Sequence, residues 1–250
     1  ACLVATGGTP RRLPVEGAEL EGVHVLRSWA DAQAIVAAAK NAKRAVVVGS
    51  SFIGMETAVS LTERDLEVHV IGQDAVPFEA VLGEDLGRAF QRAAEDEGAT
   101  FHLGTSVQRI EQTARGLAVV VGEEDEQHVE GDLVILGVGV RPATAFLEGH
   151  DFHRDDGALM TDATLALADG LYAAGDMAAF PESRLGTVVR IEHWRLAQQH
   201  GRHAAQNIAR ELAGRDREPF TRVPFFWTGQ WGISLRYVGH AEDWTEAVVD

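Results

Sequence analysis

The amino-acid sequence predicts an α/β fold built on a parallel sheet, together with a short antiparallel meander. Continuous apolar segments alternate with helical patterns along much of the chain, as in strands joined by crossover helices. Between residues 107 and 129, short strand-like segments are separated instead by an acidic turn at 123–126, which favours antiparallel pairing. A length of 250 residues corresponds to one large domain or two smaller ones.

Each element follows from its local pattern. Ser28 predicts a helix N-cap with Asp31 in the first turn, and Gly98 and Gly214 predict helix ends. The expected helices cover residues 29–40, 52–63, 83–97 and 191–212. The expected strands cover residues 2–5, 23–26, 45–48, 67–71, 100–103, 107–111, 117–121, 127–129, 133–138 and 171–174. After Pro219, aromatic residues crowd into a β-like tail.

Composition excludes several classes of function. The net charge of −16 is opposite to that of a nucleic-acid-binding protein. No segment approaches the roughly 18 consecutive apolar residues of a membrane span, and we expect a cytoplasmic protein. The single cysteine, Cys2, excludes an internal disulfide, a CxxC redox pair and a cysteine-built metal site. The histidines lack HxxxH and HExxH spacing, so no metal site is expected.

The strongest motif is AVVVGSSFIGME at residues 45–56. Gly49, Ser51 and Gly54 occupy the three glycine positions of a dinucleotide fingerprint between a strand and a helix. Gly49 allows a tight turn, Gly54 allows close packing of the helix, and the helix N-terminus favours a pyrophosphate. Ser51 departs from the pattern, because a bare backbone normally approaches the phosphate there. The motif predicts a Rossmann-like nucleotide site.

The end of the strand at 67–71 decides the choice of cofactor, because an acid there binds the ribose 2′-hydroxyl. The usual acidic position is Gly72, and Asp74 follows two residues later. No Lys or Arg lies between Ile71 and Arg88 to receive a 2′-phosphate. This pattern favours NADH over NADPH. Further along, Gly137 and Gly139 allow the backbone of LGVGV to approach a cofactor.

Several motifs in order resemble the flavin-dependent pyridine-nucleotide oxidoreductases of the glutathione-reductase fold. These are GSSFIGME, LGVGVRP, GLYAAGD and RIEHW…QHGRHAAQN. The opening ATGGTPR and the tail PFFWTGQWG…RYVG narrow the resemblance to the branch of ferredoxin reductases and apoptosis-inducing factors. The absence of a cysteine pair fits this branch, because disulfide reductases pass electrons to such a pair.

The resemblance implies a Rossmann-like NAD(H)-binding domain inserted in a partial FAD-binding domain. It assigns residues 28–140 to the NAD(H) domain, 1–27 and 141–217 to the FAD domain, and 218–250 to the start of an α+β C-terminal domain. The N-terminal FAD fingerprint of the family has no match in the chain. We therefore expect a fragment that folds its NAD domain but holds FAD poorly.

The implied activity is hydride transfer from NADH to FAD, followed by electron delivery to a ferredoxin or a Rieske-type iron–sulfur protein. The alternative is an NADH-sensing flavoprotein of the apoptosis-inducing-factor kind, whose redox state controls dimerisation or partner binding. The expected cofactors are FAD and NAD(H). A homodimer is compatible with this resemblance, and neither nucleic acid nor a membrane is an expected partner.

The resemblance also assigns roles to single residues. Phe52 resembles an aromatic gate at the junction of nicotinamide and flavin, and Glu56 resembles an acid that contacts the carboxamide or pairs with a lysine. Without the resemblance, Glu56 is an acid favoured by the helix dipole. Asp176 resembles the carboxylate that binds the flavin ribityl chain, although it could also cap a helix.

Three aromatic positions are similar to residues beside the flavin. His193 and Trp194 lie in the first turn of a helix that begins near Glu192 and whose N-terminus would point at the flavin pyrimidine. Trp227 resembles another aromatic beside the ring. Ordinary core packing is the alternative for Trp194 and Trp227.

Residues 181–222 are locally basic, with eight arginines against five acids. One interpretation is a solvated helix face followed by a linker. The other is a docking surface for an acidic electron acceptor, which could include Arg184 and Arg190.

Overall fold

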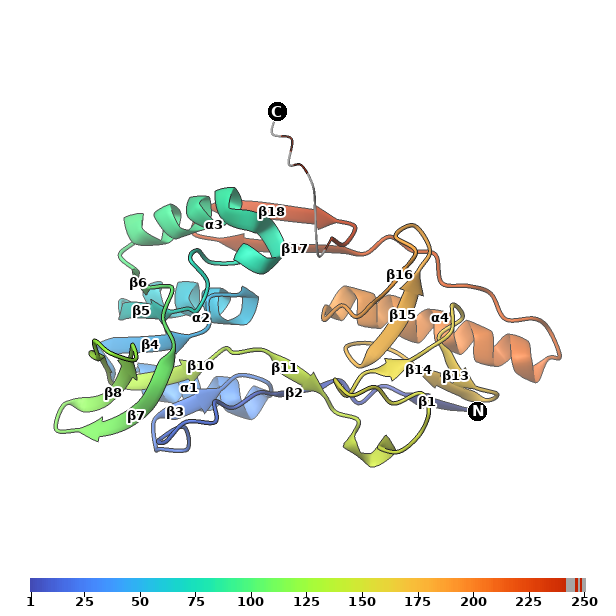
Figure 1. Cartoon of the computed structure of the whole chain (residues 1–250), viewed down its shortest axis with the longest axis horizontal. Helices are drawn as coiled ribbons and strands as arrows, with labels where there is room; N and C mark the ends of the chain where they lie inside the picture. Colours follow the sequence, from blue (N-terminus) through green and yellow to red (C-terminus); the bar gives the residue numbers. More distant parts are fainter. Residues whose placement is uncertain (242–245, 247, 249–250) are drawn as a thin grey trace. The chain divides into compact units, whose positions relative to one another are not determined.

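A computed structural model describes residues 1–241, 246 and 248 of the chain (Figure 1). The chain forms two compact units. Unit 1 comprises Ala1–Thr9, Val140–Trp227 and Arg236–His240; unit 2 comprises Pro10–Gly139, Thr228–Leu235 and the described residues from Ala241 on. In the described part of the chain, no helix is both long and apolar enough to cross a membrane.

Unit 2 is built on a five-stranded parallel sheet in the order β3-β10-β4-β5-β6. These strands are β3 (Val23–Val25), β4 (Arg44–Val48), β5 (Glu67–Ile71), β6 (Thr100–His102) and β10 (Leu133–Leu136). Both faces of the central strands are apolar, as expected when a parallel sheet is covered on both sides. Val46 and Val47, which point to opposite faces of β4, are both completely buried.

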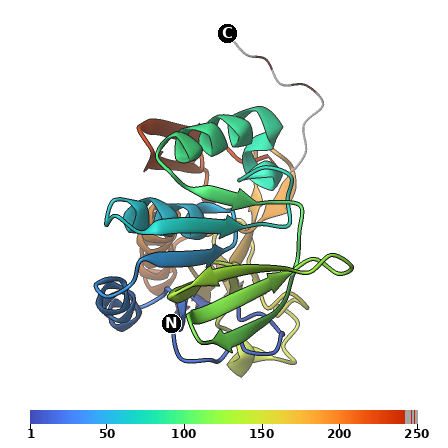
Figure 2. The ribbon, with the colours of Figure 1, turned by 90° about the vertical axis from the view of Figure 1, so that its left-hand side faces the viewer.

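The two faces of this sheet are covered by different structures (Figure 2). Helices α1 (Trp29–Ala39), α2 (Phe52–Thr62) and α3 (Glu79–Asp96) supply Ile35, Met55, Phe90 and other apolar side chains to one core. The antiparallel sheet β7 (Val107–Thr113), β8 (Gly116–Val121) and β9 (Gln127–Gly131) packs on the other face through a second core. This arrangement confirms the expected parallel sheet with an antiparallel meander.

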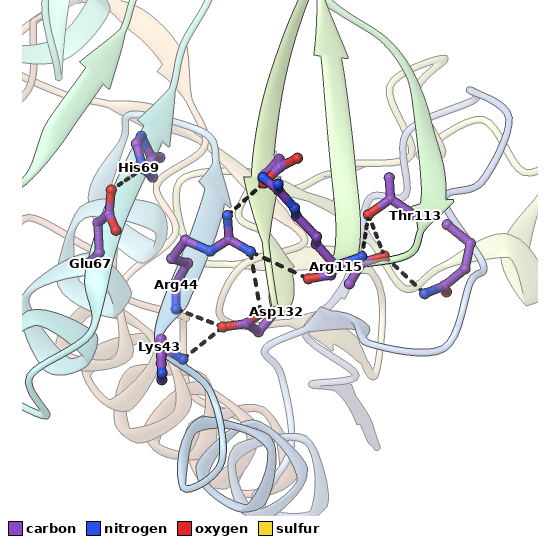
Figure 3. A network of polar contacts seen from close by, with 10 residues as sticks. Lys43, Arg44, Glu67, His69, Thr113, Arg115 and Asp132 are labelled. Carbon is purple, nitrogen blue, oxygen red and sulfur yellow. Dashed lines mark hydrogen bonds and ion pairs between the residues drawn. The ribbon is translucent and has the colours of Figure 1, made fainter.

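A network of charged groups ties the meander to β4 (Figure 3). The Asp132 carboxylate accepts hydrogen bonds from the backbone N–H groups of Lys43 and Arg44, at 2.7 and 2.9 Å. The Arg44 guanidinium donates to Glu130 at 2.7 Å and to the Arg115 carbonyl at 3.3 Å. Burial alone would raise the pKa of Asp132, but these two N–H groups and the Arg44 charge hold that pKa below its ordinary value.

Unit 1 combines short sheets with one long helix. Its three-stranded sheets are β1 (Cys2–Val4), β14 (Leu171–Ala173) and β13 (Ala166–Ala168), and β12 (Leu159–Met160), β15 (Ala178–Glu182) and β16 (Thr187–Val189). Strand β2 (Gly8–Pro10) pairs with β11 (Val140–Pro142), and Ala145–Leu147 forms a short 3₁₀ helix. The long helix α4 (Trp194–Leu212) runs beside β14 (Figure 1). Its Leu196 shares a buried cluster with Phe180 of β15, and its Ala204 shares one with Tyr172 of β14.

Most expected elements form close to their predicted bounds. Ser28 caps α1 in a complete capping box, since its hydroxyl accepts from Asp31 N–H at 3.1 Å and its own N–H donates to Asp31. Helix α3 begins before the expected residue 83, where Gly83 forms a non-helical kink with φ of +77°. Helix α4 begins at Trp194, three residues after the expected start, because His193 is its N-cap.

The units divide the chain differently from the expected domains. Residues 10–27, expected in the FAD domain, lie in unit 2 because β3 pairs with β10. The start of a separate C-terminal domain after residue 217 stays a prediction. The two strands of the tail, β17 (Phe225–Gln230) and β18 (Ile233–Val238), each have residues in both units. Expected tail residues 242–245, 247, 249 and 250 lie outside the described part.

Candidate functional site

A cleft of about 520 Å³ opens in unit 2 at the carboxyl ends of β4, β5 and β10. Ligands of open α/β sheets bind at this edge, where the loops leave the strands. The cleft is lined by Arg11, Arg12, Leu13, Pro14, Val48, Gly49, Ser50, Ser51, Ile71, Gly72, Gln73, Asp74, Thr105, Val107, Gly137, Val138 and Gly139. It therefore brings together five of the predicted cofactor-binding residues: Gly49, Ser51, Asp74, Gly137 and Gly139.

Three glycines form a tightly packed cradle beneath the cleft. Gly49 has φ of +116°, and a Cβ atom there would lie 2.3 Å from the Gly137 carbonyl oxygen. A Cβ on Gly54 would lie 1.9 Å from the Gly49 carbonyl oxygen, and one on Gly137 would lie 2.9 Å from Gly54 Cα. Side chains at these positions would push β4, α2 and the loop after β10 apart. The cradle fits a dinucleotide phosphate group, which needs close approach of bare backbone.

Ser51 is the N-cap of α2, with extended φ and ψ. Its side chain is exposed and makes no capping hydrogen bond. The first N–H groups of a helix have no partner within the helix and carry a partial positive charge. The serine in the second glycine position therefore leaves both its hydroxyl and the helix N-terminus facing the cleft.

The acid at the end of β5 is displaced for a steric reason. A Cβ atom on Gly72 would lie 2.4 Å from Ser50 Oγ and 2.9 Å from Leu103, so a side chain at the usual acidic position would require the Ser50 and Leu103 side chains to move. Asp74 is exposed at the rim of the cleft, and its backbone carbonyl accepts from Gly104 N–H at 3.0 Å. The carboxylate at residue 74 is thus the acid available at this edge.

Two arginines in the cleft were not found from the sequence. Arg11 and Arg12 come from the loop before β3, about 60 residues from Asp74 along the chain. The Arg11 N–H donates to the Gly139 carbonyl at 2.9 Å, and Arg12 pairs with Glu19 at 2.6 Å. The absence of a base between residues 71 and 88 therefore does not mean that the cleft lacks positive charge.

Phe52 and Glu56 do not line this cleft. The Phe52 ring is half-buried against Phe78, with ring centroids 4.9 Å apart. Glu56 accepts a hydrogen bond from Thr228 Oγ1 at 2.8 Å and lines a separate groove of about 400 Å³ between α1 and α2. The expected carboxamide or lysine contact of Glu56 remains a prediction.

The turn that contains Asp176 lies in unit 1, after β14. Gly175 has φ of +88°, and the Asp176 carbonyl accepts from Arg190 Nη1 at 3.0 Å. The Asp176 side chain is partly buried, and its carboxylate makes no hydrogen bond or ion pair with another described residue. No helix begins at Asp176. A carboxylate in this setting can accept a hydrogen bond from a hydroxyl group of a ligand.

The three predicted aromatic residues lie together at the N-terminus of α4. The His193 ring is 5.7 Å from both Trp194 and Trp227, measured between ring centroids. The two tryptophans contact each other edge to face at 5.3 Å. Trp194 is 62% exposed and Trp227 is 41% exposed. Both indoles therefore present apolar surface that the described residues leave uncovered.

A basic groove of about 390 Å³ runs along the exposed side of α4 in unit 1. It is lined by Arg195, Gln198, Gln199, Arg202, His203, Gln206 and Arg222. The three arginines form no ion pair with a described residue. Arg184 and Arg190 do: Arg184 pairs with the buried Glu182 and also donates to the Thr221 carbonyl, while Arg190 pairs with Glu192 at 2.5 Å.

Comparison with known proteins decides the family. The model of the pyridine nucleotide-disulphide oxidoreductase family matches residues 1–201. The chain belongs to this family. The expected resemblance to the flavin-dependent pyridine-nucleotide oxidoreductases is thereby confirmed.

Relatives place this member of the pyridine nucleotide-disulphide oxidoreductases among ferredoxin reductases and apoptosis-inducing factors. Human apoptosis-inducing factor 3 is 34% identical over 99% of the chain, which spans 40% of that protein. The ferredoxin reductase of the CYP199A2 system from Rhodopseudomonas palustris superposes with a TM-score of 0.85 at 28% identity, over 95% of the chain and 57% of the reductase.

A third relative was solved in a complex with another protein. Putidaredoxin reductase, in a covalent complex with putidaredoxin, matches with a TM-score of 0.84 at 27% identity, again over 95% of the chain and 57% of its own. The chain thus spans about half the length of the relatives it matches, so the activity of a whole protein is a matter of proposal.

Proposed function

We propose that the chain supplies the NADH-binding part, and part of the flavin site, of an oxidoreductase that delivers electrons to a ferredoxin- or Rieske-type iron–sulfur protein. The observation that carries this proposal is the cleft of unit 2, where Gly49, Gly54 and Gly137 form a bare backbone cradle and Asp74 lies at the rim. When bound, FAD supplies the chemistry that links two-electron oxidation of NADH to one-electron reduction of an acceptor.

In this proposal, each residue of the cleft has a binding or orienting task. The α2 N-terminus and Ser51 bind the pyrophosphate, and the Asp74 carboxylate accepts hydrogen bonds from the hydroxyl groups of the adenosine ribose. Gly137 and Gly139 let the loop after β10 pass close to the nicotinamide half. Phe52 covers the nicotinamide position, and Glu56, oriented by Thr228, contacts its carboxamide.

In unit 1, we assign Asp176 to the flavin ribityl chain. His193, Trp194 and Trp227 lie beside the ring, and they would exclude water from it. The His193 Nδ1 atom accepts from Arg195 N–H at 3.2 Å, which orients this imidazole at the start of α4. The partial positive charge of the helix N-terminus would stabilise negative charge on the ring.

The acceptor would dock on the basic groove of α4. Three arginines without ion pairs converge there, while Arg184 and Arg190 are engaged within unit 1. An acidic iron–sulfur protein is complementary to such a surface, and opposite charges raise the rate of encounter. The proposed docking surface therefore consists of Arg195, Arg202 and Arg222, and it does not include Arg184 and Arg190.

The experiment that tests this function measures NADH binding and then electron flow. The chain should bind NADH by calorimetry, and Gly49→Ala should abolish binding because its Cβ would clash with Gly137. With FAD added, NADH should bleach the flavin absorption, and a ferredoxin should restore it over repeated turnovers. Absence of NADH binding to the unsubstituted chain would refute the proposal.

The similarity to apoptosis-inducing factor 3 favours a second candidate, an NADH-sensing flavoprotein. In that case NADH would produce a long-lived reduced complex, turnover with a one-electron acceptor would be slow, and the oligomeric state would change on reduction. Fast turnover without a change in oligomeric state contradicts this alternative.

A further inference from the structure

His200 is a buried polar residue that the proposed reaction does not use. It lies on α4 with none of its surface exposed. Its ring is nearly perpendicular to Phe180 and to Phe220, with ring centroids 4.7 and 4.6 Å apart. An imidazole held between two phenyl rings keeps one orientation, because rotation about its side-chain bonds would clash with them.

The two ring nitrogens of His200 have different surroundings. Nδ1 accepts a hydrogen bond from the Gly175 N–H at 3.4 Å. The proton of the neutral ring therefore resides on Nε2, which is buried and has no hydrogen-bond partner among the described residues. Burial, and to a smaller degree the charge of His203, lowers the pKa of His200 to about 3. The ring is neutral, in one tautomer, at physiological pH.

The accepting atom, His200 Nδ1, faces the Gly175–Asp176 turn, which packs directly on α4. A Cβ atom on Gly175 would lie 3.3 Å from Ala197 Cβ, so the turn approaches the helix closely. A buried N–H needs an acceptor, and removing that acceptor costs the desolvation of the donor. His200 supplies an acceptor at residue 175, one residue before the carboxylate of Asp176.

The surroundings of His200 are themselves fixed by α4. The buried Asn207 donates to the Thr164 carbonyl at 2.9 Å and to the Glu218 carbonyl at 2.8 Å, and it accepts from Glu218 N–H. Phe220 N–H donates to the Ala163 carbonyl at 2.7 Å. These bonds place the Phe220 ring against His200 and close the pocket around it.

We propose that His200 is a positioning residue that holds the Gly175–Asp176 turn in the conformation that binds the flavin. The inference rests on the proposed role of Asp176. It adds that His200 of α4 fixes the geometry of this turn, because its Nδ1 atom accepts the hydrogen bond of the Gly175 N–H. A histidine that only filled the core could be replaced by an apolar residue of similar size without effect on the turn.

The first test uses the chain without flavin. Nitrogen-15 NMR of the imidazole should find Nε2 protonated and Nδ1 unprotonated between pH 5 and 8; a protonated Nδ1 would overturn the proposal. In His200→Leu, amide hydrogen exchange at Gly175 should become about tenfold faster. In His200→Gln, whose side-chain carbonyl can accept the same hydrogen bond, exchange should stay close to that of the unsubstituted chain.

The second test measures FAD affinity by fluorescence titration. His200→Leu should weaken it roughly threefold to tenfold, the factor that corresponds to one hydrogen bond, and His200→Gln should recover most of the loss. His150→Gln, which replaces an exposed histidine elsewhere in unit 1, is the control and should leave both exchange and affinity unchanged. Equal affinity in the Leu variant and the unsubstituted chain would overturn the role of His200. If the partial flavin site of this chain holds FAD too weakly for titration, as expected without the N-terminal fingerprint, the exchange and NMR results decide whether His200 holds the turn.

Discussion

Gly54 and Gly49 are in direct backbone contact, so that a Cβ atom on Gly54 would lie 1.9 Å from the Gly49 carbonyl oxygen. The first turn of α2 therefore rests on the loop that leaves β4. This contact brings the helix N-terminus to the edge of the parallel sheet, where the cleft is.

Substitution of Gly54 should disturb both stability and binding. We expect Gly54→Ala to lower the free energy of unfolding by about 3 kcal/mol, the upper end of the usual cost of adding a methyl group to a packed interior, and to weaken NADH binding because α2 must shift. Gly201→Ala is the control, since Gly201 lies inside α4 with open space around its Cα. It should raise stability by about 0.5–1 kcal/mol. Chemical denaturation and calorimetry would measure both effects. An unaltered NADH affinity in Gly54→Ala would contradict the role of the cradle.

Cofactor preference should depend on Asp74. The Asp74→Ala variant should weaken NADH binding roughly tenfold to a hundredfold, the factor for one hydrogen bond to a charged group. Gln73→Arg should strengthen NADPH binding by adding a cation beside the 2′-phosphate. Tighter binding of NADPH than of NADH by the unsubstituted chain would show the preference to be wrong.

The arginines that line the cleft give a separate expectation. If Arg12 contributes positive charge to the cleft, Arg12→Ala should weaken NADPH binding more than NADH binding, because NADPH carries the additional phosphate. Glu19→Gln, which releases Arg12 from its ion pair, should have the opposite effect. Titrations at low ionic strength would separate the two variants. Identical effects on the two dinucleotides would assign Arg12 to the shared pyrophosphate instead.

Docking of an acidic acceptor should depend on the basic groove. The double variant Arg202→Glu, Arg222→Glu should lower the association rate with an acidic ferredoxin at least tenfold at low salt and flatten its dependence on ionic strength. The double variant Arg88→Glu, Arg92→Glu, which reverses two exposed arginines of α3, is the matched control. Stopped-flow kinetics would measure the rates. Equal association rates for the groove variant and the control would show that the groove is an ordinary solvated surface.

The network around Asp132 should make unit 2 sensitive to acid. Its pKa is held below the ordinary value of 3.8, so the folded state binds a proton less readily than the unfolded state does. The stabilisation is complete above that ordinary value and is lost as the pH falls through the lower folded-state pKa. At pH 7, Asp132→Asn should be less stable by about 1–3 kcal/mol, and this difference should shrink below pH 4. A difference that stays constant from pH 7 to pH 3 would contradict this role.

Local signals in the sequence predicted the parts of the fold that depend on neighbouring residues. Strand β5 forms over the expected residues 67–71, and the Ser28 cap is complete, because apolar runs and capping boxes act over a few positions. The β15–β16 pair was not predicted, since β15 contains Pro181 and the charged Glu182. Glu182 is buried with three partners, the Arg184 guanidinium and the backbone N–H groups of Arg184 and Leu185. Gly49 has a positive φ, which fits the tight turn expected there.

The site, like the fold, was predictable only where its residues are close together in the sequence. Gly49, Ser51 and Asp74 of the cleft belong to one continuous βαβ segment, and the fingerprint spacing locates them. Arg12 joins this cleft from a distant loop, and Glu56 bonds to Thr228, 172 residues away. No pattern within a window of sequence carries such pairings. His200 gave no signal either, because an imidazole on an amphipathic helix has the same spacing whether it is buried or exposed.

The hydrogen bonds of Asn207 have a practical consequence for anyone who shortens this chain. The sequence suggests a natural boundary after residue 217, just beyond the end of α4. Ending the chain there would remove Glu218 and Phe220. The Asn207 side chain would then keep one of its three hydrogen bonds, the one to the Thr164 carbonyl. Loss of the Phe220 ring would also expose one side of His200 to water. We expect a recombinant version that stops at residue 217 to be less soluble and more readily proteolysed than one that continues past Phe220. The better boundary for expression therefore lies beyond residue 220.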